Sequence, residues 1–290
     1  MSDVALVIVI IAAVLHSGWN YFLKKSLDKL AYIWSFLLVS VVFYAPMFFY
    51  YWVRTDIPIE GWVCICATGF LHFLYFGFMG SAYERGDLSL VYPISRGSGP
   101  LLVPVLAVLF LREKIYPLGA LGIGLIVLGI YVIHLKSFAR DAFLAPFREV
   151  KSSASILSIL TGLTIAGYSL VDKVGVGFVE PPLYIYCMVL IAVALLSPFV
   201  LVKKREALRR EWRYNRNNIL VVGIVVLLTY LMVLFAFRIS KVSYVVAVRE
   251  LSIVLSAMYG LIWLKEKHVR QKLTGSVIIA LGVIFIGVSR

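Results

Sequence analysis

Ten apolar runs, each close to the length that crosses a bilayer, constrain this chain more than any other feature. A transmembrane helix needs about 20 apolar residues. Hydrophobic residues make up 62% of the chain and charged residues 15%, whereas soluble domains are about 45–50% apolar and about 25% charged. The sequence therefore predicts an all-α, multi-pass integral membrane protein with ten transmembrane helices, at residues 4–23, 32–52, 62–82, 88–111, 116–135, 155–172, 182–202, 218–237, 242–264 and 272–289.

The basic residues give an expected orientation. Most of the lysines and arginines behind the net charge of +13 lie in the odd-numbered connections between runs. Positive connections stay in the cytoplasm, so both termini are expected outside, in a bacterial-type inner (plasma) membrane. Topology accounts for this charge without a nucleic-acid partner. The first run has no small-residue cleavage site, which favours a retained helix over a signal peptide.

The second half of the sequence repeats the first. A shift of 153 places Arg96 on Arg249, and it pairs the motif at 111–114 with that at 264–267. The repeats are expected at residues 1–137 and 154–290, joined by 138–153. Five spans are an odd number, so the second repeat enters the membrane inverted. Inverted repeats in transporters enclose the substrate site at their interface, near the midplane.

The duplicated L-x-E-K motif, the Gly-rich helix after each copy and the opening HSGWN at residues 16–20 resemble the EamA-type ten-span transporters of the drug/metabolite transporter superfamily. The resemblance covers nearly the whole chain. Arg112 and Lys265 stand where that family usually has glycine before the glutamate. The resemblance implies a basket of ten helices around a central cavity lined by spans one, three, four, six, eight and nine.

Two arginines inside apolar runs are the main candidates for substrate binding. Arg96 lies about 12 Å into the fourth run and Arg249 about 10 Å into the ninth. Entering from opposite faces, they are expected to meet near the midplane, where an unpaired arginine costs about 2.5–3.5 kcal/mol. Guanidinium groups bind carboxylate or phosphate. The alternatives are a structural ion pair or gate, with Glu250 bridging to Arg96, and snorkelling to the lipid interface.

The stretch PISRGSGP, residues 93–100, carries two prolines and two glycines beside Arg96. These residues are expected to weaken the fourth helix, which is tolerated at membrane depth where a helix lines a cavity. Tight packing of helices through small residues is the other interpretation.

Further candidates for shaping the pocket come from spans one, three and six: His16, Trp19, Asn20, His72, Tyr75 and Tyr168. A histidine here could relay a proton or serve as a structural hydrogen-bonding group, and the aromatic rings could stack on a substrate or simply pack. Glu250 and Asp172 are the candidates for gating or proton coupling.

These features predict a secondary transporter that moves a small anionic or amino-acid-like metabolite by alternating access, using an ion gradient or exchange. No enzyme motif, metal ligand set or cofactor site is expected. The expected partners are the substrate, lipids, a proton or counter-substrate, and a second copy through the Gly-rich spans five and ten. The rival hypotheses are a translocator or membrane enzyme acting on lipid-linked intermediates, and a non-transporting receptor or assembly protein.

Overall fold

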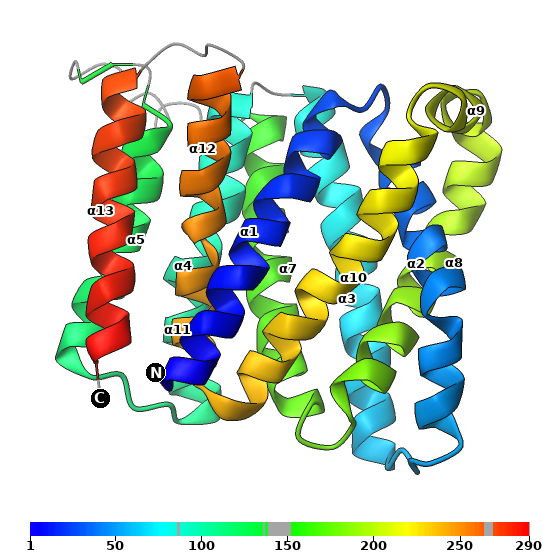
Figure 1. Cartoon of the computed structure of the whole chain (residues 1–290), viewed down its shortest axis with the longest axis horizontal. Helices are drawn as coiled ribbons and strands as arrows, with labels where there is room; N and C mark the ends of the chain where they lie inside the picture. The colour runs from blue at the N-terminus through cyan, green and yellow to red at the C-terminus, as the bar shows by residue number, and fades with distance from the viewer. Residues whose placement is uncertain (86–87, 136, 139–151, 264–268, 290) are drawn as a thin grey trace.

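The computed structural model describes residues 1–85, 88–135, 137–138, 152–263 and 269–289, and these form a bundle of upright helices (Figure 1). The helices of the first half are α1 (Asp3–Lys25), α2 (Lys29–Trp52), α3 (Ile59–Arg85), α4 (Leu88–Leu111) and α5 (Pro117–Ile133). Those of the second half are α7 (Ser153–Gly175), α8 (Pro181–Lys203), α9 (Arg205–Tyr214), α10 (Arg216–Ile239), α11 (Val242–Arg249), α12 (Leu251–Trp263) and α13 (Val269–Val288).

The ten predicted spans are present, and eight described helices are long and apolar enough to cross a membrane. Helix α5 is apolar but only 17 residues long, and the ninth span is divided between α11 and α12. Nearly continuous apolar sequence gives helix rather than sheet here, because a helix satisfies all of its own backbone groups in hydrocarbon.

Local sequence fixes where several helices begin. The side chain of Ser2 accepts a hydrogen bond from the N–H of Ala5 at the start of α1, and Ser152 does the same for Ser155 at the start of α7. These caps satisfy backbone donors that have no partner inside the helix. Helices α5 and α8 instead begin with proline, which has no N–H to satisfy.

The packing of the helices follows the inverted repeat. Helix α1 begins at the end of the bundle that holds both termini, whereas α7 begins at the opposite end (Figure 1). Helix α3 packs on α7, and the pair that the repeat makes equivalent to it, α10 and α1, is also in contact. Helices α2 and α8, which are equivalent to each other, also meet, as do α5 and α13. The two halves therefore interlock around a common centre.

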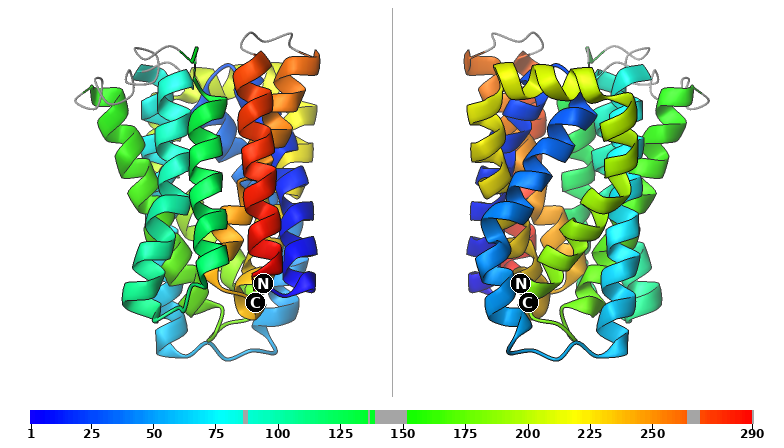
Figure 2. Two further views of the ribbon diagram at one scale, coloured as in Figure 1. Left: turned by 90° about the vertical axis from the view of Figure 1, so that its left-hand side faces the viewer. Right: turned by 90° about the vertical axis from the view of Figure 1, so that its right-hand side faces the viewer.

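Glycines on α5 and α13 face each other within one chain. A Cβ built on Gly122 would lie 2.7 Å from the carbonyl oxygen of Gly282, and one on Gly129 would lie 2.8 Å from that of Gly275. The two helices stand side by side in Figure 2. Close backbone approach through small residues is the ordinary use of such faces in membranes. A contact between two copies through these helices remains a prediction and would have to use their outer faces.

The helix break lies in span nine and not in its repeat equivalent, span four. Helix α4 runs unbroken through residues 93–100, so no interruption lies beside Arg96, and the weakening of the helix by these residues stays a prediction. The interruption lies instead at Glu250, between α11 and α12. The N–H of Glu250 donates to the carbonyl of Ala247, one residue tighter than an α-helical bond.

The backbone at the end of α4 explains why the resembling family usually has glycine where this chain has Arg112. Arg112 has φ of 54°, the left-handed conformation that glycine adopts without penalty. A glycine is therefore the natural residue at this position, and Arg112 accepts the turn at some cost. The equivalent Lys265 lies outside the described residues.

Candidate functional site

A cavity lies between the two halves and is lined by α1, α2, α3, α4, α7, α8, α10 and α11. It holds about 70 Å³, several times the 10–15 Å³ or so that one water needs by the same measure. The resemblance placed spans two and seven outside the lining, but α2 and α8 also contribute to it. Seven of the predicted pocket residues line the cavity: His16, Trp19, His72, Tyr75, Arg96, Tyr168 and Arg249.

Both predicted arginines reach the same carboxylate. Oε1 of Glu250 lies 3.9 Å from Nη1 of Arg96 and 3.7 Å from Nη2 of Arg249. Helix α4 brings Arg96 from one end of the bundle, and α11 brings Arg249 from the other (Figure 1). The predicted contact between Arg96 and Glu250 across the halves is present. Two guanidinium groups against one carboxylate leave one positive charge at this wall of the cavity.

Arg249 has hydrogen-bond donors that no described acceptor satisfies. Its side chain is 3% exposed, and within the described part of the chain its Nε and Nη2 atoms have no hydrogen-bond partner. The 3.7 Å from Nη2 of Arg249 to Oε1 of Glu250 exceeds the 2.7–3.2 Å or so of a hydrogen bond. The interaction is therefore an ion pair without a hydrogen bond. Unsatisfied buried donors on a charged group are costly. This guanidinium is therefore suited to receive an anionic group.

Arg96 is held differently, by a histidine. Nη2 of Arg96 donates to Nε2 of His16, and because a guanidinium can only donate, this nitrogen of His16 must be the unprotonated one. The ring of His16 also meets that of Trp19 edge-on, with centroids 4.8 Å apart. Helix α1 thus fixes the direction of Arg96. Asn20 does not line the cavity.

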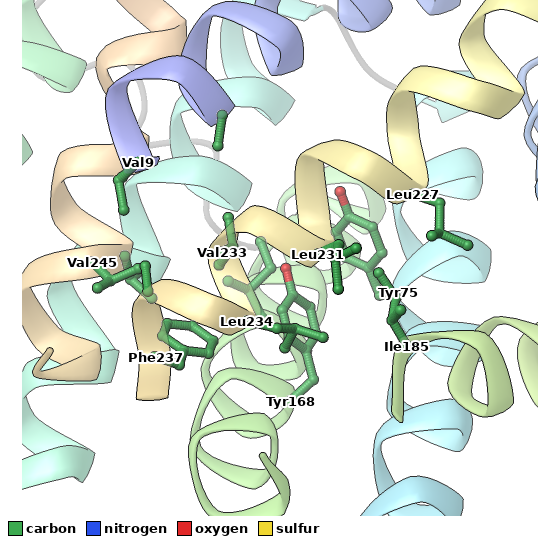
Figure 3. Packing of buried hydrophobic residues seen from close by; sticks show 14 of the residues in the cluster. Val9, Tyr75, Tyr168, Ile185, Leu227, Leu231, Val233, Leu234, Phe237 and Val245 are labelled. Atoms are coloured by element: carbon green, nitrogen blue, oxygen red, sulfur yellow. The ribbon is translucent and has the colours of Figure 1, made fainter. Parts of the chain in front are cut away.

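Aromatic side chains form the wall on the α3 side. His72 stacks on Tyr168, with ring centroids 4.2 Å apart, and Tyr75 meets Tyr168 edge-on at 5.8 Å. Figure 3 shows Tyr75 and Tyr168 beside α10, which supplies Leu227 and Val233 to the cavity. Nδ1 of His72 lies 2.9 Å from the carbonyl of Thr68, to which it donates. His72 is thereby fixed in orientation.

Asp172 lies behind this wall and not in the cavity lining. It is fully buried and accepts hydrogen bonds from the hydroxyls of Tyr184, at 2.9 Å, and Tyr230. Tyr230 itself lines the cavity. A hydroxyl therefore connects the carboxylate to the cavity, and the predicted coupling role of Asp172 stays a prediction.

The two halves are also tied together at the end that holds the termini. The carboxylate of Glu113, from the repeated motif, accepts from the N–H of Val242 at 2.7 Å and from the hydroxyl of Ser243 at 2.6 Å. It thus caps α11, where a negative charge is favourable. Within the second half, Lys173 of α7 donates to the carbonyls of Phe237 and Ser240 at the end of α10. The matching Glu266 lies outside the described residues.

Several lining residues were not predicted from the sequence. Tyr230 and Thr229 form a polar pair in an otherwise apolar part of span eight, and that contrast could have identified them. Met188, Val189 and Ala192 on α8 gave no such signal, because their span is apolar throughout.

Comparison with known proteins agrees with this arrangement. A crystal structure of another protein superposes with a TM-score of 0.73, covering 98% of both chains at 15% identity, which establishes similarity of fold. No curated protein sequence matches. The sequence matches the EamA-like transporter family twice, over residues 4–135 and 152–288, which together make up most of the chain. The chain therefore belongs to the EamA-like transporter family and is a membrane transporter of the drug/metabolite superfamily.

Proposed function

We propose that this transporter moves a small metabolite with an anionic group, a carboxylate, phosphate or phosphonate, through the cavity between its halves. The observation that carries the proposal is the buried Arg249, whose Nε and Nη2 atoms have no hydrogen-bond partner among the described residues. Guanidinium presents parallel donors that match such anions in a fork. The surplus positive charge of Arg96 and Arg249 over Glu250 favours a ligand with one net negative group at this wall.

The rest of the cavity suits the remainder of such a substrate. Rings of Trp19, Tyr75 and Tyr168 offer flat apolar surface, and the hydroxyl of Tyr230 offers a polar contact. Binding would compete with Glu250 for the two arginines. Release of Glu250 from its ion pairs is thus a means by which substrate changes the balance between conformations.

Alternating access is the transport mechanism that the inverted halves support best. The contacts of Glu113 with the N–H of Val242 and the hydroxyl of Ser243 join the halves at the end that holds the termini. Opening that end requires their separation, so these contacts act as its gate. Glu250 and Asp172 are the carboxylates placed to couple protons or to lock a state.

The test is ligand-dependent thermal stability of the purified chain in detergent. Amino acids, organic acids, phosphate esters and phosphonates would be screened. A ligand that binds only the folded state stabilises it by about 2.7 kcal/mol at a hundredfold excess over its Kd. We expect an anion to raise the unfolding midpoint of the wild type and to lose this effect in Arg249→Gln, but not in Arg54→Gln, which alters an exposed arginine.

Counterflow in liposomes then distinguishes transport from binding alone. The stabilising anion should exchange across the membrane in the wild type and not in Arg249→Gln. Stabilisation only by cations or neutral molecules, or transport undiminished in folded Arg96→Ala and Arg249→Ala, would refute the anionic assignment.

A further inference from the structure

Helix α9, between α8 and α10, is held on the bundle by one face. Ala207 and Glu211 are buried there, with Leu208 and Trp212 half-buried beside them. Oε1 of Glu211 accepts the N–H of Asp28 at 2.6 Å. Glu211 is therefore used in docking the helix, and it does not neutralise the outer face.

The outer face of α9 is strongly basic. Arg205, Arg209 and Arg213 are exposed at spacings of four, with Arg210 exposed beside them, and Arg216 is exposed at the start of α10. Glu206 is the one exposed acidic residue of α9. None of these five arginines makes an ion pair with a carboxylate in the described part of the chain. Like charges four residues apart destabilise a helix. A face of this kind is stabilised when an external anion lies over it.

The position of α9 indicates where that anion comes from. The span of α8 ends at Lys203 and that of α10 begins at Arg216, so α9 lies where two membrane helices leave the hydrocarbon. Figure 2 (right) shows it crossing the end of the bundle opposite the termini. Tyr214 on this helix is 67% exposed, and tyrosine and tryptophan favour the level of the lipid headgroups.

We propose that the outer face of α9 is a binding site for the headgroups of anionic phospholipids. Arginines here would hold the lipid phosphates at the membrane surface, and the exposed ring of Tyr214 would lie at the level of the headgroups. This site is separate from the cavity between the halves and does not depend on the identity of the cargo.

The experiment compares lipids that differ only in charge. The full-length protein, delipidated in detergent, is titrated with phosphatidylglycerol or phosphatidylcholine of the same acyl chains, and bound lipids are counted by native mass spectrometry. We expect preferential binding of phosphatidylglycerol. The double variant Arg209→Gln/Arg213→Gln should bind it about 25-fold more weakly, since each basic residue near an anionic surface contributes about fivefold.

A matched double variant separates this site from a general effect of charge. Arg54→Gln/Lys114→Gln removes two exposed basic residues elsewhere and should keep wild-type affinity. The unfolding midpoint without lipid should not fall in the α9 variant, because its substituted side chains are exposed and mutually repulsive.

Three results would overturn the proposal: equal binding of the two lipids, wild-type affinity in the α9 variant, or equal losses in both double variants. A further titration uses inorganic phosphate as a competitor of phosphatidylglycerol. If phosphate alone displaces phosphatidylglycerol at millimolar concentration and stabilises the wild type as strongly, the face is a site for free anions and not for lipid.

Discussion

Arg96 and Glu250 belong to opposite halves of the chain, yet Nη1 of one lies 3.9 Å from Oε1 of the other, with their side chains 6% and 2% exposed. Arg249 lies 3.7 Å from the same oxygen. Single mutations in this cluster therefore change both the stability of the bundle and its response to anions, and the two effects can be measured separately.

Neutralising Glu250 is the most direct test of the cluster. In Glu250→Gln both arginines lose their shared counter-charge while buried, and breaking a buried pair in this way typically costs about 3–5 kcal/mol. We expect a lower unfolding midpoint in detergent and, because the competing carboxylate is gone, a larger rise of that midpoint on adding the anionic ligand. Glu206→Gln, at an exposed position on α9, is the control. A wild-type midpoint with an unchanged anion response would contradict this account.

Removing the carboxylate of Glu113 should weaken the end that holds the termini. Glu113→Ala leaves the N–H groups of Val242 and Ser243 without this acceptor, at a cost of about 1–3 kcal/mol. We expect the midpoint of thermal unfolding to fall. Asp56→Ala removes an exposed acidic residue and should be close to neutral. Equal effects of the two substitutions would show that Glu113 acts only through the net charge.

Adding one methyl group to a facing glycine should force α5 and α13 apart. In Gly129→Ala the new Cβ would lie 2.5 Å from Cγ1 of Ile279 and 2.8 Å from the carbonyl oxygen of Gly275. Backbone cannot yield as a side chain can, so we expect a loss of about 1–3 kcal/mol. In Gly124→Ala the new Cβ has no described atom within 4 Å apart from its chain neighbours and the backbone of its own helix, and a gain of up to about 1 kcal/mol is expected. The test compares the midpoints of thermal unfolding of the two variants, and equal midpoints would contradict the close packing of α5 on α13.

The sequence predicted the spans well because hydrocarbon imposes one requirement on every residue that it contacts. The positions of helix breaks were harder to predict from the sequence. The strongest signals, Pro93 and Gly97 among them, lie in the unbroken α4, whereas the break at Glu250 has no adjacent glycine or proline. Glu250 at this break forms an ion pair with Arg96 of the other half, a long-range contact that local sequence does not reveal.

Some residues of the candidate site could likewise be predicted from the sequence, and others could not. Arg96 and Arg249 could be predicted because charge in an apolar run is costly and needs a reason. The residues of α8 in the cavity could not, since an apolar side chain facing a cavity looks the same in sequence as one facing lipid. Residues 203–217 lie between two predicted spans, and the many charges of α9 hide its short amphipathic pattern in the sequence.

Acid should unfold the protein partly through Asp28, at the start of α2. Burial opposes its charge, but the N–H of Ala31 and the ammonium of Lys204, 2.9 Å away, outweigh burial and lower the pKa of Asp28. Stability from this carboxylate is complete above its unfolded pKa of about 3.9 and is lost as the pH falls through the lower folded value. Asp28→Asn keeps a good helix cap but removes the charge. Its unfolding midpoint should lie below that of the wild type at about pH 6, and the difference should shrink toward zero below about pH 3. A difference that stays constant across this range would show that the ion pair with Lys204 contributes nothing.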